Sequence, residues 1–138
     1  MLGDYDTDEE VIIDPLIYST YVSDTGWEHA RAITYDSAGN AYVTGFTLST
    51  NFPTTAGAYD KSHNGGTDVY VFKLNVAGSA LIFSTFVGGN GSDSGYGIAI
   101  NTFNQVYVAG GTSSYNFPTS TGTFLTLLPK ATLGYCLF

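Results

Sequence analysis

The acidic side chains are the residues of this sequence best suited to chemistry, because carboxylates bind metal ions and transfer protons. Asp4, Asp6 and Asp8 have the alternate spacing of a calcium-binding loop. Such a loop needs glycine at its sixth position and glutamate at its twelfth, and here the sixth is not glycine and the twelfth is Pro15. We therefore interpret these three residues as part of a solvated acidic linker.

Three further carboxylates, those of Asp24, Glu28 and Asp93, lie in loops that the sequence pattern places after outgoing strands. Calcium could bind weakly at such loops, but turn formation and solvation are the favoured roles for these side chains. The sequence therefore predicts no metal-ligating residue.

The remaining candidates for catalysis are two histidines and one pair of carboxylates. His29 and His63 are far apart in the sequence, and no serine–histidine–aspartate pattern includes them. Asp36 and Asp60 are the closest carboxylates to consider as a glycosidase pair, but no sequence feature gives them a shared cleft. We predict no catalytic residue and no cofactor.

Composition excludes several classes of partner. The 138 residues carry 12 acidic and 4 basic side chains, a formal charge of −8, which argues against nucleic acid or an anionic membrane surface. No apolar run approaches the roughly 20 residues of a membrane-spanning helix. Cys136 is the only cysteine, so neither an intrachain disulfide nor a cysteine-based zinc site can form.

An internal repeat organises the chain. Residues 16–59 align with 81–124 without a gap, at an offset of 65 residues, and 17 of the 44 aligned pairs are identical. Non-identical pairs keep their character, as in Tyr18 and Phe83. One structural unit therefore occurs twice.

Each unit is predicted to contain four strands. The clearest are 68–75 and 80–87, and the other two are 31–36 and 41–47, which recur at 96–101 and 106–112. Turn-forming sequences separate them, and Asn104 stands where the first copy has Gly39, which predicts a left-handed backbone at this position.

The predicted strands are apolar on both faces. In 80–87, Leu81, Phe83 and Val87 alternate with Ile82 and Phe86. A sheet with one face in water would alternate apolar with polar residues, so both faces of this sheet must be covered. We therefore predict an all-β fold of four-stranded antiparallel blades, packed face to face as in a β-propeller, with about two blades and thus an incomplete propeller.

A long connection, residues 48–66, joins the second and third strands. Its Asn-Phe-Pro-Thr sequence at 51–54 recurs at 116–119, and an aromatic residue, Tyr59 or Phe124, follows in both copies. A packed anchor that fixes the loop is the favoured interpretation, and a ligand-contacting rim is the alternative.

The repeat divides the chain into five segments. The expected segments are an acidic lead-in from the tail of an upstream domain (1–15), an outer strand that completes the first blade (16–22), a first full repeat (23–87), a second, partial blade (88–124) and a divergent C-terminal end (125–138). Nothing in the last segment matches 68–75, whose copy is due at 133–140.

The order and offset of these blocks resemble the SBBP family of seven-bladed β-propeller repeats of bacteria and archaea. The matching blocks are 19–22, 32–45, 51–59, 68–75, 77–81 and 84–89. Two departures are Ser23-Asp24 in place of the Gly88-Gly89 pair, and the bulky Trp27 in a loop that is small and polar in the family. The resemblance implies a fragment of a larger secreted or surface protein, in which Met1 does not begin a natural domain.

The resemblance also implies a function: a non-catalytic extracellular module that serves as a scaffold or binds a protein or carbohydrate ligand, with neighbouring blades of the same parent chain beside it. The alternative is a fragment of a carbohydrate-active propeller enzyme, a glycosidase or lyase, whose site lies in blades outside this piece. A third expectation follows from the strands themselves, because unpaired strand edges invite self-association.

Overall fold

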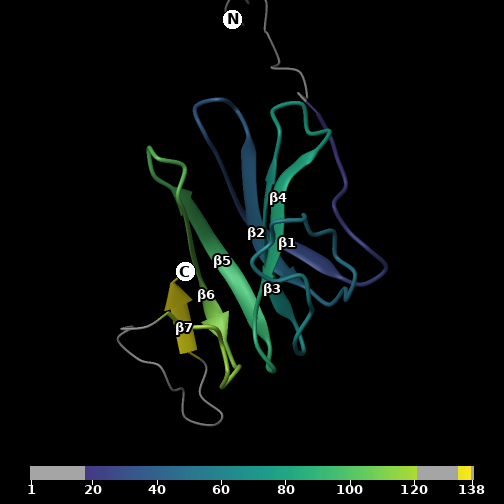
Figure 1. Ribbon diagram of the computed structural model, residues 1–138, viewed down its shortest axis with the longest axis vertical. Coiled ribbons are helices and arrows are strands. Elements are labelled where there is room, and N and C mark those ends of the chain that lie inside the picture. The colour runs from purple at the N-terminus through teal and green to yellow at the C-terminus, as the bar shows by residue number, and fades with distance from the viewer. Residues whose placement is uncertain (1–17, 121–133, 138) are drawn as a thin grey trace, which may run out of the picture.

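The computed structural model describes residues 18–120 and 134–137, which form two antiparallel sheets and contain no helix (Figure 1). The first sheet contains, in order, β1 (Glu28–Tyr35), β2 (Ala41–Thr47), β3 (Asp68–Leu74) and β4 (Leu81–Val87). The second contains β5 (Asp93–Ile100), β6 (Val106–Thr112) and β7 (Gly134–Leu137). The predicted all-β class is confirmed, and the described strands form two open sheets rather than a closed ring.

Three tight turns join neighbouring strands, and each is built in the same way. The side chains of Asp36, Asn75 and Asn101 each accept backbone N–H groups further along their own turn. Three residues later the chain has a positive φ, 84° at Gly39, 65° at Gly78 and 59° at Asn104. The left-handed backbone predicted at Asn104 is confirmed.

A β-bulge interrupts the first strand of each sheet at the same place in the repeat. The register of β1 against β2 shifts between Ala30 and Ala32, and that of β5 against β6 shifts between Gly95 and Gly97. Because a bulge lets a strand continue past an extra residue, β1 and β5 begin three residues earlier than the sequence pattern predicts.

The two sheets pack against each other through their apolar faces. Val69, Val71 and Val87 of the first sheet form one buried cluster with Val108 of β6, and Ile98 of β5 packs against it. We call this side of the first sheet its stacked face. β5 contacts β1, β2 and β3, so the second sheet lies across the first (Figure 1).

The opposite side of the first sheet, here called its open face, has its own cluster of buried residues. Strands β2 to β4 contribute Val43, Tyr70, Phe72 and Phe86, and the long connection contributes Phe52. The expectation that both faces of this sheet bury apolar side chains is therefore confirmed.

The long connection between β2 and β3 also covers the outer edge of β4. Thr55 N–H donates to the carbonyl oxygen of Ser84 over 3.1 Å, and Phe86 N–H donates to that of Asp60 over 3.0 Å. The Oγ of Ser84 donates to the Pro53 carbonyl. These bonds protect an edge that would otherwise be open to pairing.

Two predicted segments differ from the structure. Residues 18–22, the described part of the predicted outer strand 16–22, belong to no strand, and the partner equivalent to β3 falls at residues 3–10, outside the described residues. β7 lies where the third strand was due although its sequence does not match, so the second sheet extends into the segment 125–138. Residues 1–15 lie outside the described residues.

Candidate functional site

A groove of about 460 Å³ opens at the end of the sheets where β2, β4 and β6 finish. The first repeat and the second both contribute to it. Its lining residues are Tyr59, Asp60, Asn64, Gly88, Gly89, Asn116 and Pro118. We call it the loop-end groove, and it includes part of the connection that the sequence offered as a ligand-contacting rim.

Hydrogen bonds fix the polar side chains of this groove. The Oδ1 of Asp60 accepts the N–H of Ser62 over 2.8 Å, and its Oδ2 accepts from the Nδ2 of Asn64 over 2.6 Å. Across the groove, the Oδ1 of Asn116 accepts the N–H of Asn90 over 2.8 Å. A carboxylate and two amides are therefore held in place before any ligand arrives.

Tyr59 supplies the groove with an aromatic surface. Its side chain is 73% exposed although it follows a loop anchored by Phe52, which is only 2% exposed. The aromatic ring offers a ligand a flat apolar surface, and the fixed polar groups beside it offer directional hydrogen bonds. This combination suits a polyhydroxylated molecule.

Beneath the groove two buried carboxylates, Asp68 and Asp93, flank Gly88. A Cβ on Gly88 would meet the Oδ1 of Asp68 at 2.6 Å and the Oδ2 of Asp93 at 3.0 Å, so glycine is the residue that fits between them. The Oδ2 of Asp68 accepts the N–H of Asn64 over 2.7 Å. The buried Oδ1 of Asp68 has no hydrogen-bond partner among the described residues.

Asp68 carries a raised pKa because it is buried. Desolvation is the main cause, the nearby charge of Asp93 adds to it, and the N–H of Asn64 acts in the opposite direction. Because its folded-state pKa lies above the unfolded value, Asp68 favours folding below the unfolded pKa. That contribution is lost as the pH rises through the folded pKa.

Asp68→Asn is therefore expected to stabilise the protein at neutral pH. An amide stays neutral there and can donate to Asp93, which is worth about 1 kcal/mol in the free energy of unfolding. Urea denaturation between acid and neutral pH measures the difference from the wild type, which should be smallest at low pH and grow as the pH rises. Asp24→Asn, outside this cluster, serves as the control; a loss of stability by Asp68→Asn that is equal at every pH would contradict the assignment.

Asp93 fastens the end of β6 to the start of β5. Its Oδ2 accepts the N–H of Gly89 over 2.8 Å and the Oγ of Ser114 over 2.7 Å, and its Oδ1 accepts from Thr112. The carboxylate is fully buried and surrounded by donors. These hydrogen bonds give the Asp93 carboxylate a structural role in this fold.

Glu28, the copy of Asp93 in the first repeat, accepts the equivalent hydrogen bonds. Its Oε1 accepts from the hydroxyls of Thr47 and Ser49, which are the copies of the two hydroxyls that bind Asp93. Its Oε2 accepts from Ser23. Burial raises the pKa of Glu28, but the hydrogen bonds from Ser23, Ser49 and Thr47 outweigh it and lower the pKa overall.

The structure does not assemble the candidate calcium residues into a site. Glu28 and Asp93 occupy equivalent places in different sheets, and Asp24 accepts from its neighbour Thr25. Among residues 18–120 and 134–137, no three acidic, histidine or cysteine side chains group so that they could hold a metal ion. Asp4, Asp6, Asp8 and the lead-in lie outside the described residues.

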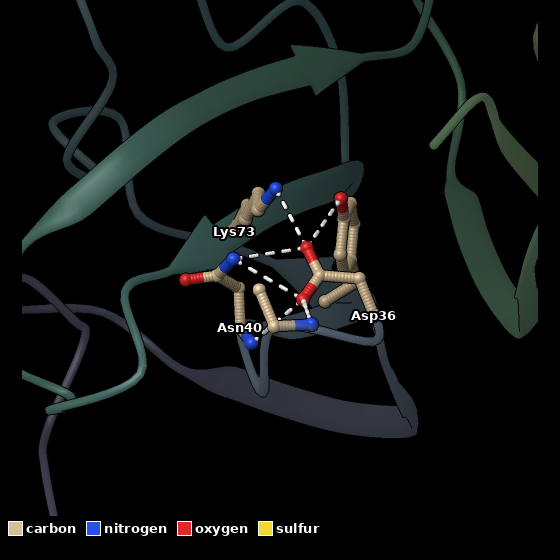
Figure 2. Close-up of polar contacts among 5 residues, drawn as sticks. Asp36, Asn40 and Lys73 are labelled. Carbon is tan, nitrogen blue, oxygen red and sulfur yellow. Dashed lines mark hydrogen bonds and ion pairs between the residues drawn. The ribbon is translucent and has the colours of Figure 1, made fainter. Parts of the chain in front are cut away.

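Asp36 locks the turn between β1 and β2, as Figure 2 shows. Its carboxylate accepts from the backbone and side chain of Asn40, forms an ion pair with Lys73 Nζ at 2.9 Å and accepts the Tyr42 hydroxyl. The bonds from Asn40, and then the contact with Lys73, hold the pKa of Asp36 well below its ordinary value. This network ties β1, β2 and β3 together at one end of the sheet.

Asp36 and Asp60 cannot act as a glycosidase pair. Tyr35, the residue before Asp36, lies level with Leu81 at the start of β4, whereas Asp60 is bonded to Phe86, five residues further along that strand. Five strand residues span about 16 Å, and paired catalytic carboxylates lie roughly 5–10 Å apart.

The two histidines also lie apart from each other. His29 stacks on Phe46 with ring centroids 4.9 Å apart. His63 meets Phe86 edge-on with centroids 6.1 Å apart, and its buried Nε2 has no partner among the described residues. Both are used in aromatic packing.

Sequence reasoning missed the groove and the meeting of Asp68 with Asp93, because both are built across two repeats. The signals that could have found them were the paired Gly88 and Gly89 and the recurrence of Asn116 in the loop motif.

In comparisons with known proteins, no protein-family model and no curated protein matches this chain. Within the described part of the chain, no helix is long and apolar enough to cross a membrane.

Proposed function

We propose that this chain is a non-catalytic module of β-propeller type that binds a carbohydrate in the loop-end groove of an extracellular or surface protein. The observation that carries the proposal is the groove itself, in which Tyr59 lies beside the fixed polar groups of Asp60, Asn64 and Asn116. The resemblance to SBBP repeats supports the propeller type and the location. In this proposal the stacked sheets are the scaffold that holds the loops.

The hydrogen bonds that three acidic side chains accept support binding rather than catalysis. Glu28, Asp36 and Asp93 each accept several hydrogen bonds that fasten strands or turns. Asp68 and Asp93 both approach Gly88 closely, and both are 0% exposed. A glycosidic bond must lie between its two catalytic carboxylates, and no sugar reaches a pair buried beneath Gly88.

Tyr59→Ala tests the proposal. The protein is expected to bind members of a glycan array, and loss of the ring should weaken that binding about tenfold, the cost of removing one aromatic contact. Phe103→Ala removes an aromatic side chain that is 83% exposed, on the turn between β5 and β6, and should leave binding unchanged.

The same samples distinguish binding from turnover. Incubation with the glycans that bind should release no reducing sugar. Release of reducing sugar would favour the carbohydrate-active enzyme instead, and equal weakening by Tyr59→Ala and Phe103→Ala would remove the groove as the binding site.

A further inference from the structure

The internal repeat indicates which kind of surface packs on the open face of the first sheet. In the second sheet, Ile98 and Val108 are covered by Val69, Val71 and Val87 of the first sheet. Ile33 and Val43 are the copies of Ile98 and Val108, and they lie on the open face. The open face is thus equivalent to a surface that a neighbouring sheet covers.

Only part of such a neighbouring sheet is present on the open face. Val22, the copy of Val87, packs against the open-face cluster. Next to it lies a groove of about 840 Å³, lined by residues 18–23 on one side and by Val43, Tyr70 and Phe72 on the other. Ile33 at its margin is 70% exposed.

Two of the valines that cover Ile98 and Val108 are not repeated one repeat earlier in the sequence. The positions of Val69 and Val71 fall, one repeat earlier, on Asp4 and Asp6. Aspartate carboxylates cannot reproduce the apolar contacts that Val69 and Val71 make with Ile98 and Val108. The second sheet of another copy of this chain is the occupant considered for the groove.

The second sheet presents the complementary surface. The side of β5 and β6 that faces away from the first sheet, here called the outer face, exposes Tyr96 and Tyr107. Tyr107 is the copy of Tyr42, which lies on the stacked face of the first sheet. The outer face is therefore equivalent to a surface that covers a neighbouring sheet.

Among the described residues, the second sheet has no strand equivalent to β4 of the first sheet. β4 pairs with β3 in the first sheet, whereas β7 has no described partner beyond β6. The sequence copy of β4 is 16–22, and its described part belongs to no strand.

We propose that two copies of this chain associate head to tail, the outer face of one copy's second sheet packing on the open face of the other copy's first sheet. Residues 18–22 of the second molecule then lie along β7 of the first and add a fourth strand to its sheet. The contact repeats the packing seen inside one chain and joins two different surfaces, so it is heterologous. It does not depend on carbohydrate binding.

Charge predicts how this association depends on salt. The chain carries a formal charge of −8, so two copies repel each other at long range. Screening weakens that repulsion, and the apolar contact is not weakened. Association should strengthen as the salt concentration is raised.

Two exposed substitutions and their mixture test the proposal by sedimentation equilibrium. The average mass of the wild type should exceed that of the monomer and rise with protein concentration in the micromolar range. Ile33→Asp places a charge on the open face, and Tyr107→Asp places one on the outer face. Each variant alone should therefore stay monomeric. Their equimolar mixture should form a dimer and nothing larger, because one intact surface of each kind remains. Phe103→Asp, on a turn outside both surfaces, should behave as the wild type.

Three results would overturn the proposal: a wild type that is monomeric throughout, a mixture that stays monomeric, or a control variant that dissociates the wild-type assembly. Circular dichroism confirms that each variant is folded, and Ile33→Ser or Tyr107→Ser replaces one that is not, with the same expected masses. Loss of glycan binding with association intact would count against the proposed function alone.

Discussion

Replacing Phe52 with alanine is expected to lower the free energy of unfolding by about 3–5 kcal/mol, the usual effect of deleting a buried aromatic ring. The ring is 2% exposed and stacks on Tyr70 with centroids 4.7 Å apart. It also contacts Phe72 and Phe86, with centroids 6.3 and 6.1 Å away. Urea denaturation followed by circular dichroism measures the change.

The matched control for this substitution is Phe103→Ala. Its ring is 83% exposed, and substitutions at such positions change stability by about 0.5 kcal/mol or less. Similar losses for the two variants would show that the long connection is not anchored by Phe52. The same loop positions Tyr59, so Phe52→Ala should also weaken glycan binding.

The second large effect is expected at Gly45, in the middle of β2. A Cβ there would meet the carbonyl oxygen of His29 at 1.8 Å, because the β1 backbone closes on this residue beside the bulge. The obstacle is backbone that cannot rotate away, so Gly45→Ala should destabilise the fold by about 3 kcal/mol. The thermal unfolding midpoint reports the loss.

Gly97→Ala, in β5 of the second repeat, provides the comparison. A Cβ on Gly97 would meet nothing within 4 Å, and its copy in the first repeat is already an alanine, Ala32. Removing a strand glycine from an open position should leave stability unchanged or raise it by about 0.5 kcal/mol. A Gly45→Ala protein as stable as Gly97→Ala would contradict the close approach of β1 and β2.

The local features of this fold could be predicted from the sequence because they depend on neighbouring residues. Apolar patterning gave β2 and β6 with their observed bounds, and the turn sequence gave the left-handed Asn104. The recurrence of 51–54 correctly indicated a packed loop, since Phe52 is buried in the open-face cluster.

The features that sequence reasoning missed depend on contacts between distant segments. The bulges at the start of β1 and β5 form opposite Gly45 and Gly110, which admit the neighbouring backbone. β7 forms by pairing with β6 although its sequence lacks the repeat pattern. Asp68 and Asp93 meet only because one sheet stacks on the other.

Face-to-face stacking of the two sheets is the claim on which the groove, the Asp68–Asp93 contact and the assembly all depend. Nuclear Overhauser effects between valine and isoleucine methyl groups test it directly in labelled protein. The structure predicts cross-peaks from Val69 or Val71 of the first sheet to Val108 or Ile98 of the second, and none from Val43, on the opposite face, to Val108. Absence of the first set, or cross-peaks from Val43 to Val108, would contradict the stacked arrangement.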